Sequence, residues 1–121
     1  MGVHMGVKDR MYQLTSIEQV DEFMKKHPTG VIFKAGACHR TTDALDCMEQ
    51  VLGGQEKIPV ACVRVVENRS VSNYITEKTG IVHQSPQFIL IVNGKVVFDV
   101  DNWEITPESL EPALEKFLGA T

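Results

Sequence analysis

The chain has 121 residues, of which 43% are apolar and 23% charged, a composition typical of one globular domain with its own core. Its net charge of −4 argues against a nucleic-acid partner, and no apolar run is long enough to span a bilayer. We therefore expect a protein that binds neither nucleic acid nor membrane.

The first ten residues are set apart from the rest of the chain. They contain no signal-peptide core, and the methionines at positions 5 and 11 suggest a segment that could derive from cloning. We expect residues 1–10 to be a flexible N-terminal segment and residues 11–121 to form the folded domain.

The first half of the domain alternates strands and helices. Residues 11–14 are a short strand candidate, and Thr15 to Gln19 resemble a capping box that opens an amphipathic helix. Pro28 and Gly30 stop that helix, and the apolar run 31–33 predicts the second strand. A second helix is predicted from about residue 38 to 52.

The third strand and third helix complete this alternation. The apolar run 60–66 is interrupted only by Arg64, as expected for a strand buried on both faces. Ser70 is predicted to cap a short helix that Gly80 closes.

The second half predicts a hairpin and a closing helix. Asn93-Gly94 is a strong two-residue turn signal between the strand candidates 88–92 and 95–100. Thr106-Pro107 opens the last helix with a cap and an N1 proline. The order β-α-β-α-β-α-β-β-α predicts an α/β protein with a thioredoxin-like fold, whose central mixed sheet has four to five strands flanked by helices.

Cys38 is the residue that suggests chemistry. It follows the strand 31–33 through a loop of small residues and lies at the first turn of the next helix. Unpaired N–H groups at a helix N-terminus favour the thiolate, which is the nucleophilic form of cysteine. The alternative is a buried structural cysteine.

The three cysteines, at 38, 47 and 62, are odd in number and form no C-x-x-C motif. This pattern disfavours a secreted disulfide framework and a zinc site, and we expect a reducing, cytoplasmic compartment and no bound metal. The apolar neighbours of Cys47 and Cys62 predict core positions for both.

Ser85-Pro86 precedes the first hairpin strand. In a thioredoxin-like fold this position holds a cis proline that faces the active-site cysteine, so we predict a cis bond close to the Cys38 loop. An ordinary trans turn is the alternative that applies to most X-Pro bonds.

Several segments together resemble the monothiol bacilliredoxin family, thioredoxin-like proteins of the bacterial bacillithiol system. The resemblance covers about residues 12–118. The family continuation Cys-Pro-Ile-Ser is Cys38-His39-Arg40-Thr41 in this chain, so Thr41 can replace the serine hydroxyl. The matching segments are Phe33-Lys34 with Cys38, Val66 to Ile75, His83-Gln-Ser-Pro-Gln87, Asn93-Gly-Lys-Val-Val97 and Trp103-Glu-Ile-Thr106.

The resemblance implies an oxidoreductase that removes bacillithiol, or a related small thiol, from mixed disulfides on oxidised client proteins. Cys38 would carry the small thiol until a second thiol or a partner reductase frees it, with no tightly bound cofactor. Two alternatives remain: a non-catalytic thioredoxin-fold binding module, and a glutathione-dependent monothiol glutaredoxin-like protein.

Other residues are candidates for binding substrate or tuning the thiolate, each with a structural alternative. Thr41 can reach the thiolate or cap the helix, His39 and Arg40 can stabilise it or be solvated, and Lys34 can bind a carboxylate or only extend to solvent. The remaining candidates are His83, which could approach the same face or be structural, Ser85 and Pro86 of the predicted cis bond, and Trp103, which could wall a groove or pack at the core edge.

Overall fold

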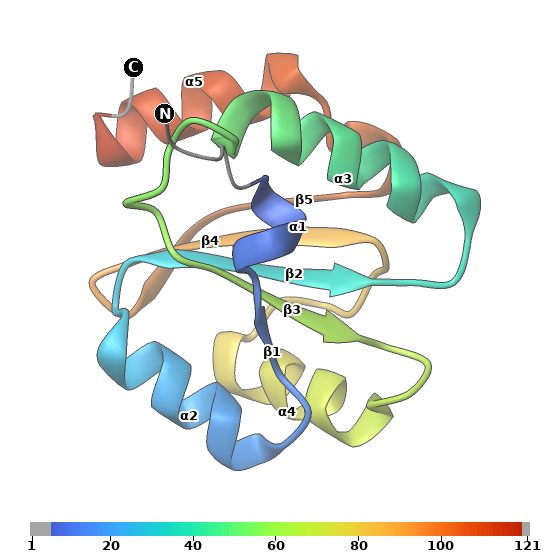
Figure 1. The fold of residues 1–121 in the computed structure, drawn as a ribbon. Helices are drawn as coiled ribbons and strands as arrows, with labels where there is room; N and C mark the ends of the chain where they lie inside the picture. Colours follow the sequence, from blue (N-terminus) through green and yellow to red (C-terminus); the bar gives the residue numbers. More distant parts are fainter. Residues whose placement is uncertain (1–5, 120–121) are drawn as a thin grey trace.

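The computed structural model describes residues 6–119, which fold into a five-stranded sheet with helices on both faces (Figure 1). No helix in this part of the chain is long and apolar enough to cross a membrane. The helices are α1 (Val7–Arg10), α2 (Ile17–Lys26), α3 (His39–Leu52), α4 (Arg69–Thr79) and α5 (Pro107–Leu118), with a 3-10 turn η1 (Asn102–Glu104). The strands are β1 (Tyr12–Gln13), β2 (Gly30–Ala35), β3 (Val60–Arg64), β4 (Gln87–Val92) and β5 (Lys95–Asp101).

The sheet is mixed, with strand order β1-β3-β2-β4-β5. Strands β1, β3 and β2 are parallel, whereas β4 runs antiparallel to β2, and β5 runs antiparallel to β4. The carboxyl end of β2 therefore lies beside the start of β4. This topology brings the Cys38 loop and the Ser85-Pro86 turn to the same edge of the sheet.

Strand β2 is buried on both faces and separates two apolar clusters. Phe33 packs on the side of α3 and α5, and Ile32 packs on the side of α2 and α4. Figure 1 shows these two helix pairs on opposite faces of the sheet. The two-residue alternation of a strand explains why neighbouring side chains enter different clusters.

Most element boundaries follow local signals in the sequence. Ser16 accepts a hydrogen bond from the amide of Gln19 at 3.1 Å, and Thr106 caps α5 in the same way. Asn93 and Gly94 both have positive φ, at 53° and 81°, as the predicted tight hairpin turn requires. Gly80, with a φ of 73°, closes α4.

Several boundaries differ from the predictions by one or two residues, and those of α4 and β3 have a clear physical reason. Helix α4 begins at Arg69 after Asn68, so Ser70 is not its cap. Strand β3 ends at Arg64 instead of Val66, because the amide of Asn68 bonds to the carbonyl of Arg64 and turns the chain away from the sheet.

The prediction that residues 1–10 lie outside the fold is wrong for α1. Val7 is fully buried in the core, and the Arg10 guanidinium donates hydrogen bonds to three backbone carbonyls. These acceptors belong to Leu52, Gln55 and Ile58, so α1 holds the carboxyl end of α3 and the loop that follows it. The part of the prediction that concerns residues 1–5 falls outside the described residues.

Candidate active site

Cys38 is the N-cap residue of α3, at the start of the helix as predicted, and it is exposed, so the alternative of a buried structural cysteine is wrong. It has extended backbone, with a φ of −90° and a ψ of 166°, and its carbonyl accepts a hydrogen bond from the amide of Thr41 at 3.0 Å. The thiol therefore lies at the N-terminus of α3, where the first amides of a helix have no carbonyl four residues earlier to bond.

The pKa of the Cys38 thiol is lowered from its ordinary value. Desolvation acts to raise this pKa. The backbone amides of Arg40 and Thr41 and the positive charge of Arg40 act to lower it, and together they outweigh the desolvation. The Thr41 hydroxyl acts on this pKa in the same direction. The net result favours the thiolate, which is the form that attacks a disulfide.

Thr41 connects the thiol to the preceding loop. Its side chain is buried, and its hydroxyl oxygen accepts a hydrogen bond from the amide of Gly36 at 3.0 Å. With its acceptor side engaged by Gly36, the hydroxyl is free to donate to the sulfur of Cys38. The interpretation of Thr41 as a helix cap is wrong, because Cys38 occupies that position.

The Ser85-Pro86 peptide is cis, as predicted, and it lies against the Cys38 loop. A Cβ atom added to Gly36 would come within 2.9 Å of Ser85 Oγ, so only glycine fits this approach without a shift. The carbonyl of Pro86 accepts a hydrogen bond from the amide of Asn102 at 2.9 Å, which joins the turn to η1. Gly36 was not among the sequence candidates, although its place in a run of small residues was a signal.

Arg40 and Trp103 form the third side of this surface. The Arg40 guanidinium carbon lies 5.2 Å from the centroid of the Trp103 ring, within cation–π range. Trp103 is 71% exposed, so its interpretation as a core-edge aromatic is wrong. Its position supports the alternative in which it borders the substrate surface. His39, the first residue of α3, is also exposed.

Lys34 lies elsewhere, on the face of β2 that packs against α4. Its side chain is fully buried, and its ammonium donates to Thr76 Oγ1 at 2.8 Å and lies 3.2 Å from His83 Nδ1. Burial lowers the pKa of Lys34 to about 8. A buried ammonium neither extends to solvent nor reaches a substrate carboxylate, so neither predicted role of Lys34 fits the structure.

His83 contacts the buried ammonium of Lys34 although its own side chain is exposed. Desolvation lowers the pKa of His83, and the charges of Lys34 and Arg69 act in the same direction. Its ring nitrogen also lies 3.4 Å from Ser72 Oγ. These contacts support the structural interpretation of His83, and nothing in the sequence pointed to Lys34 and Ser72 as its partners.

The other two cysteines differ from Cys38 in their electrostatic setting. Burial raises the pKa of Cys47, and the carboxylates of Asp43, Asp46 and Glu108 raise it further. Cys62 is buried in β3, and burial raises its pKa to about 11. All three thiols are free, and Cys38 is the one with a lowered pKa.

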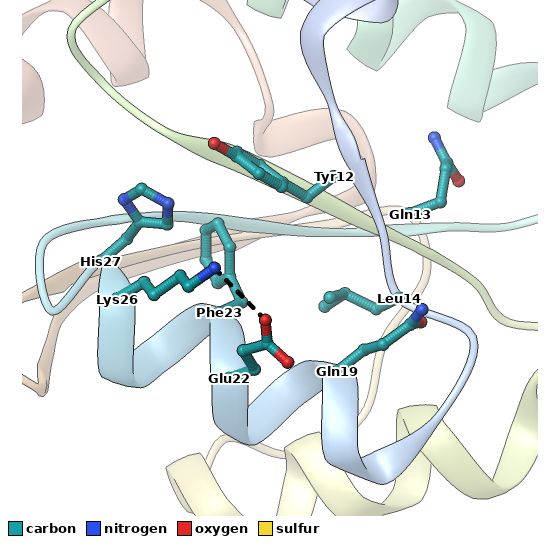
Figure 2. A pocket seen from close by; sticks show the side chains of 8 residues that line it. All are labelled: Tyr12, Gln13, Leu14, Gln19, Glu22, Phe23, Lys26 and His27. Carbon is teal, nitrogen blue, oxygen red and sulfur yellow. Dashed lines mark ion pairs between the residues drawn. The ribbon is translucent and has the colours of Figure 1, made fainter.

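Away from Cys38, the described part of the chain has a pocket but no candidate metal site. Within residues 6–119, no group of three or more His, Cys, Asp or Glu side chains could hold a metal ion. Figure 2 shows a pocket of about 240 Å³ between β1 and α2, with Tyr12, Phe23 and His27 on one side and the Glu22–Lys26 ion pair on the other. This pocket contains no thiol, so it does not offer the chemistry of Cys38.

Several solved structures have the same fold. A structure described provisionally as an oxidoreductase with a thioredoxin fold shares 27% identity and a TM-score of 0.78, over 88% of this chain and 95% of that one. A thioredoxin from Trypanosoma brucei brucei has 22% identity and a TM-score of 0.72, over 91% and 92%. A thioredoxin variant from Halobacterium salinarum has 16% identity and a TM-score of 0.72, over 93% and 94%. The predicted thioredoxin-like fold is therefore confirmed.

The comparison with family models agrees with the resemblance seen in the sequence. The model described as monothiol bacilliredoxin BrxC matches residues 12–110, which include Cys38, the cis-proline turn and Trp103. The chain belongs to the monothiol bacilliredoxin BrxC family, within the thioredoxin-like redox proteins.

Proposed function

We propose that this protein is a thiol–disulfide oxidoreductase that uses Cys38 alone to remove bacillithiol, or a related small thiol, from mixed disulfides on client proteins. The observation that carries the proposal is the position of one exposed thiol with a lowered pKa at the N-terminus of α3, against a cis-proline turn. Membership of the monothiol bacilliredoxin family supports the choice of substrate.

The reaction is an exchange of one disulfide for another. The Cys38 thiolate attacks the small-thiol sulfur of the mixed disulfide, the client thiolate leaves, and it takes a proton from water. Cys38 then holds the small thiol in a new disulfide. A second small thiol or a partner reductase attacks that disulfide and returns Cys38 to its reduced form.

The positions of the other cysteines support a single-thiol mechanism. A disulfide requires Cα atoms about 4.4–6.8 Å apart, whereas nine residues of helix separate Cys38 and Cys47 by roughly 13.5 Å at 1.5 Å per residue. Helix α3 is continuous from His39 to Leu52, so this separation holds. Cys62 is buried and keeps its proton.

The departure from the family sequence at His39, Arg40 and Thr41 is compatible with this chemistry. Thr41 supplies the hydroxyl that a serine would give, and this hydroxyl acts to lower the pKa of Cys38. Arg40 lowers the pKa of Cys38 and packs on Trp103, so a charged residue has a defined place in the site.

The experiment is release of bacillithiol from a client protein that carries it as a mixed disulfide, measured by the mass of the client. The wild type, Cys47→Ala and Cys62→Ala should release it, and Cys38→Ser should not. Release by Cys38→Ser would contradict the proposal. The two alternatives give different results: a non-catalytic binding module releases nothing, and a glutathione-dependent protein acts faster on a client that carries glutathione.

A further inference from the structure

A second cavity lies beside the Cys38 loop, between α1 and the first turns of α3. Its volume is about 310 Å³, within the range of roughly 300–1,000 Å³ that small-molecule sites occupy. Its floor comes from β1 and β3, and the carboxyl end of β2 closes one side. In Figure 1, α1 lies over these strands next to α3.

The cavity lies next to Cys38, because two of its lining residues flank Cys38 in the sequence. Gly36 and Thr41 line the cavity, and the Thr41 hydroxyl also acts to lower the pKa of Cys38. In the sheet, β3 and β4 flank β2 on opposite sides. The cavity is therefore on the β3 side of the Cys38 loop, whereas the Ser85-Pro86 turn is on the β4 side.

The polar groups that line the cavity suit an anion. Lys8 and Arg64 bring two positive charges, and no Asp or Glu is among the lining residues. Arg64 pairs through Nε with Glu67 at 3.0 Å, which leaves other guanidinium N–H groups to donate. Gln13 adds an amide, and Cys62 adds a thiol whose raised pKa keeps it protonated.

We infer that this cavity binds the carboxylate-bearing end of the small thiol that becomes attached to Cys38. The inference rests on the proposed function and adds where the small thiol lies. The client protein then occupies the other side of the disulfide, toward Pro86 and Trp103. Lys8 and Arg64 act as binding residues that select an anionic thiol over a neutral one.

The test uses three disulfides that differ in charge: 3,3′-dithiodipropionate (anionic), 2-hydroxyethyl disulfide (neutral) and cystamine (cationic). In each case the Cys38 thiolate attacks one sulfur, the S–S bond breaks, and the second thiol leaves and is protonated by water. Intact mass against time gives the rate of modification, and peptide mapping assigns the adduct to Cys38. The quantity compared between variants is the ratio of the anionic to the neutral rate.

The double variant Lys8→Gln/Arg64→Gln should lower this ratio about fivefold at low salt, because two exposed charges each have a modest effect. The ratio of cationic to neutral rates should rise. The control Lys57→Gln/Lys116→Gln removes the same charge from exposed positions that do not line the cavity, and it should leave the ratio unchanged.

A second variant tests the cavity without removing any cation. Gln13 is exposed at β1, so Gln13→Glu should fold normally and place a carboxylate in the cavity, which should lower the anionic-to-neutral ratio. An unchanged anionic-to-neutral ratio in both cavity variants would overturn the inference, and so would an equal fall of this ratio in the Lys57→Gln/Lys116→Gln control. In either case, modification of Cys38 by the disulfides would still support the proposed function. If none of the disulfides modifies Cys38 in the wild type, the proposed function itself fails.

Discussion

The reactivity of Cys38 depends on groups that lie within three residues of it. The amides of Arg40 and Thr41 act to lower the pKa of Cys38 because the chain enters α3 at this point, and the backbone supplies them whatever the side chains are. The charge of Arg40 and the hydroxyl of Thr41 are the side-chain contributions, and these can be removed separately.

Thr41→Val is predicted to raise the pKa of Cys38. Valine keeps the shape of the side chain but cannot donate to the sulfur, and it leaves the amide of Gly36 without its acceptor. The loss of that hydrogen bond should also cost about 1–2 kcal/mol of stability. The pH dependence of the iodoacetamide reaction measures the change, with Thr41→Ser as the control that keeps the hydroxyl. A pKa of Cys38 that is the same in wild type and Thr41→Val would refute the role of this hydroxyl.

Lys34 gives a prediction for stability against pH. Its pKa is about 8 in the folded protein and 10.5 in its ordinary state, so between these values the unfolded chain binds more protons than the folded one. The stability of the wild type should therefore rise with pH in this window relative to Lys34→Met, by up to about 3 kcal/mol at 1.36 kcal/mol per unit.

Urea unfolding of both proteins at pH 7, 8.5 and 10 checks this prediction. The difference between the two proteins, rather than either curve alone, isolates Lys34, because Cys62 titrates in the same range with the opposite effect on stability. A difference that stays constant from pH 7 to pH 10 would show that burial does not lower the pKa of Lys34 in the folded protein.

At the scale of elements, α1 is too short to be stable alone and depends on the rest of the fold. Val7 is fully buried among residues of α3 and the sheet, and Arg10 bonds to carbonyls 42 to 48 positions along the chain. The helix also forms one wall of the cavity that we assign to the small thiol. Both folding and binding therefore require α1 in its place.

Val7→Ala is predicted to destabilise the protein by about 1–3 kcal/mol, because it removes two buried methyl groups and leaves a cavity. Thermal or urea unfolding measures the loss. The matched control is Val66→Ala, the same substitution at a side chain that is 60% exposed, and its effect should be small. Equal effects of the two substitutions would show that α1 does not contribute to the core.

At the scale of the whole molecule, the sequence predicted the features that depend on neighbouring residues. The caps at Ser16 and Thr106, the Asn93-Gly94 turn and the exposure of Cys38 are all set by local chemistry. Together with the apolar runs, these signals were sufficient for the element order and the fold.

The features that sequence analysis missed depend on residues far apart in the chain. Helix α1 has only four residues, and its stability comes from carbonyls that the sequence does not place near Arg10. Lys34 was predicted to reach solvent or substrate, although strand alternation puts it on the same face as Ile32. Its burial required polar partners on α4 and in the following loop, Thr76 and His83, which no periodicity reveals.

The central claim is that Cys38 works without a second cysteine of the same chain, and one measurement tests it most directly. The folded protein is incubated with oxidised bacillithiol, and intact mass with peptide mapping locates every modified thiol. The wild type and the double variant Cys47→Ala/Cys62→Ala should each gain one bacillithiol on Cys38, and Cys38→Ser should gain none. An internal Cys38–Cys47 or Cys38–Cys62 disulfide in the wild type would contradict the single-thiol mechanism.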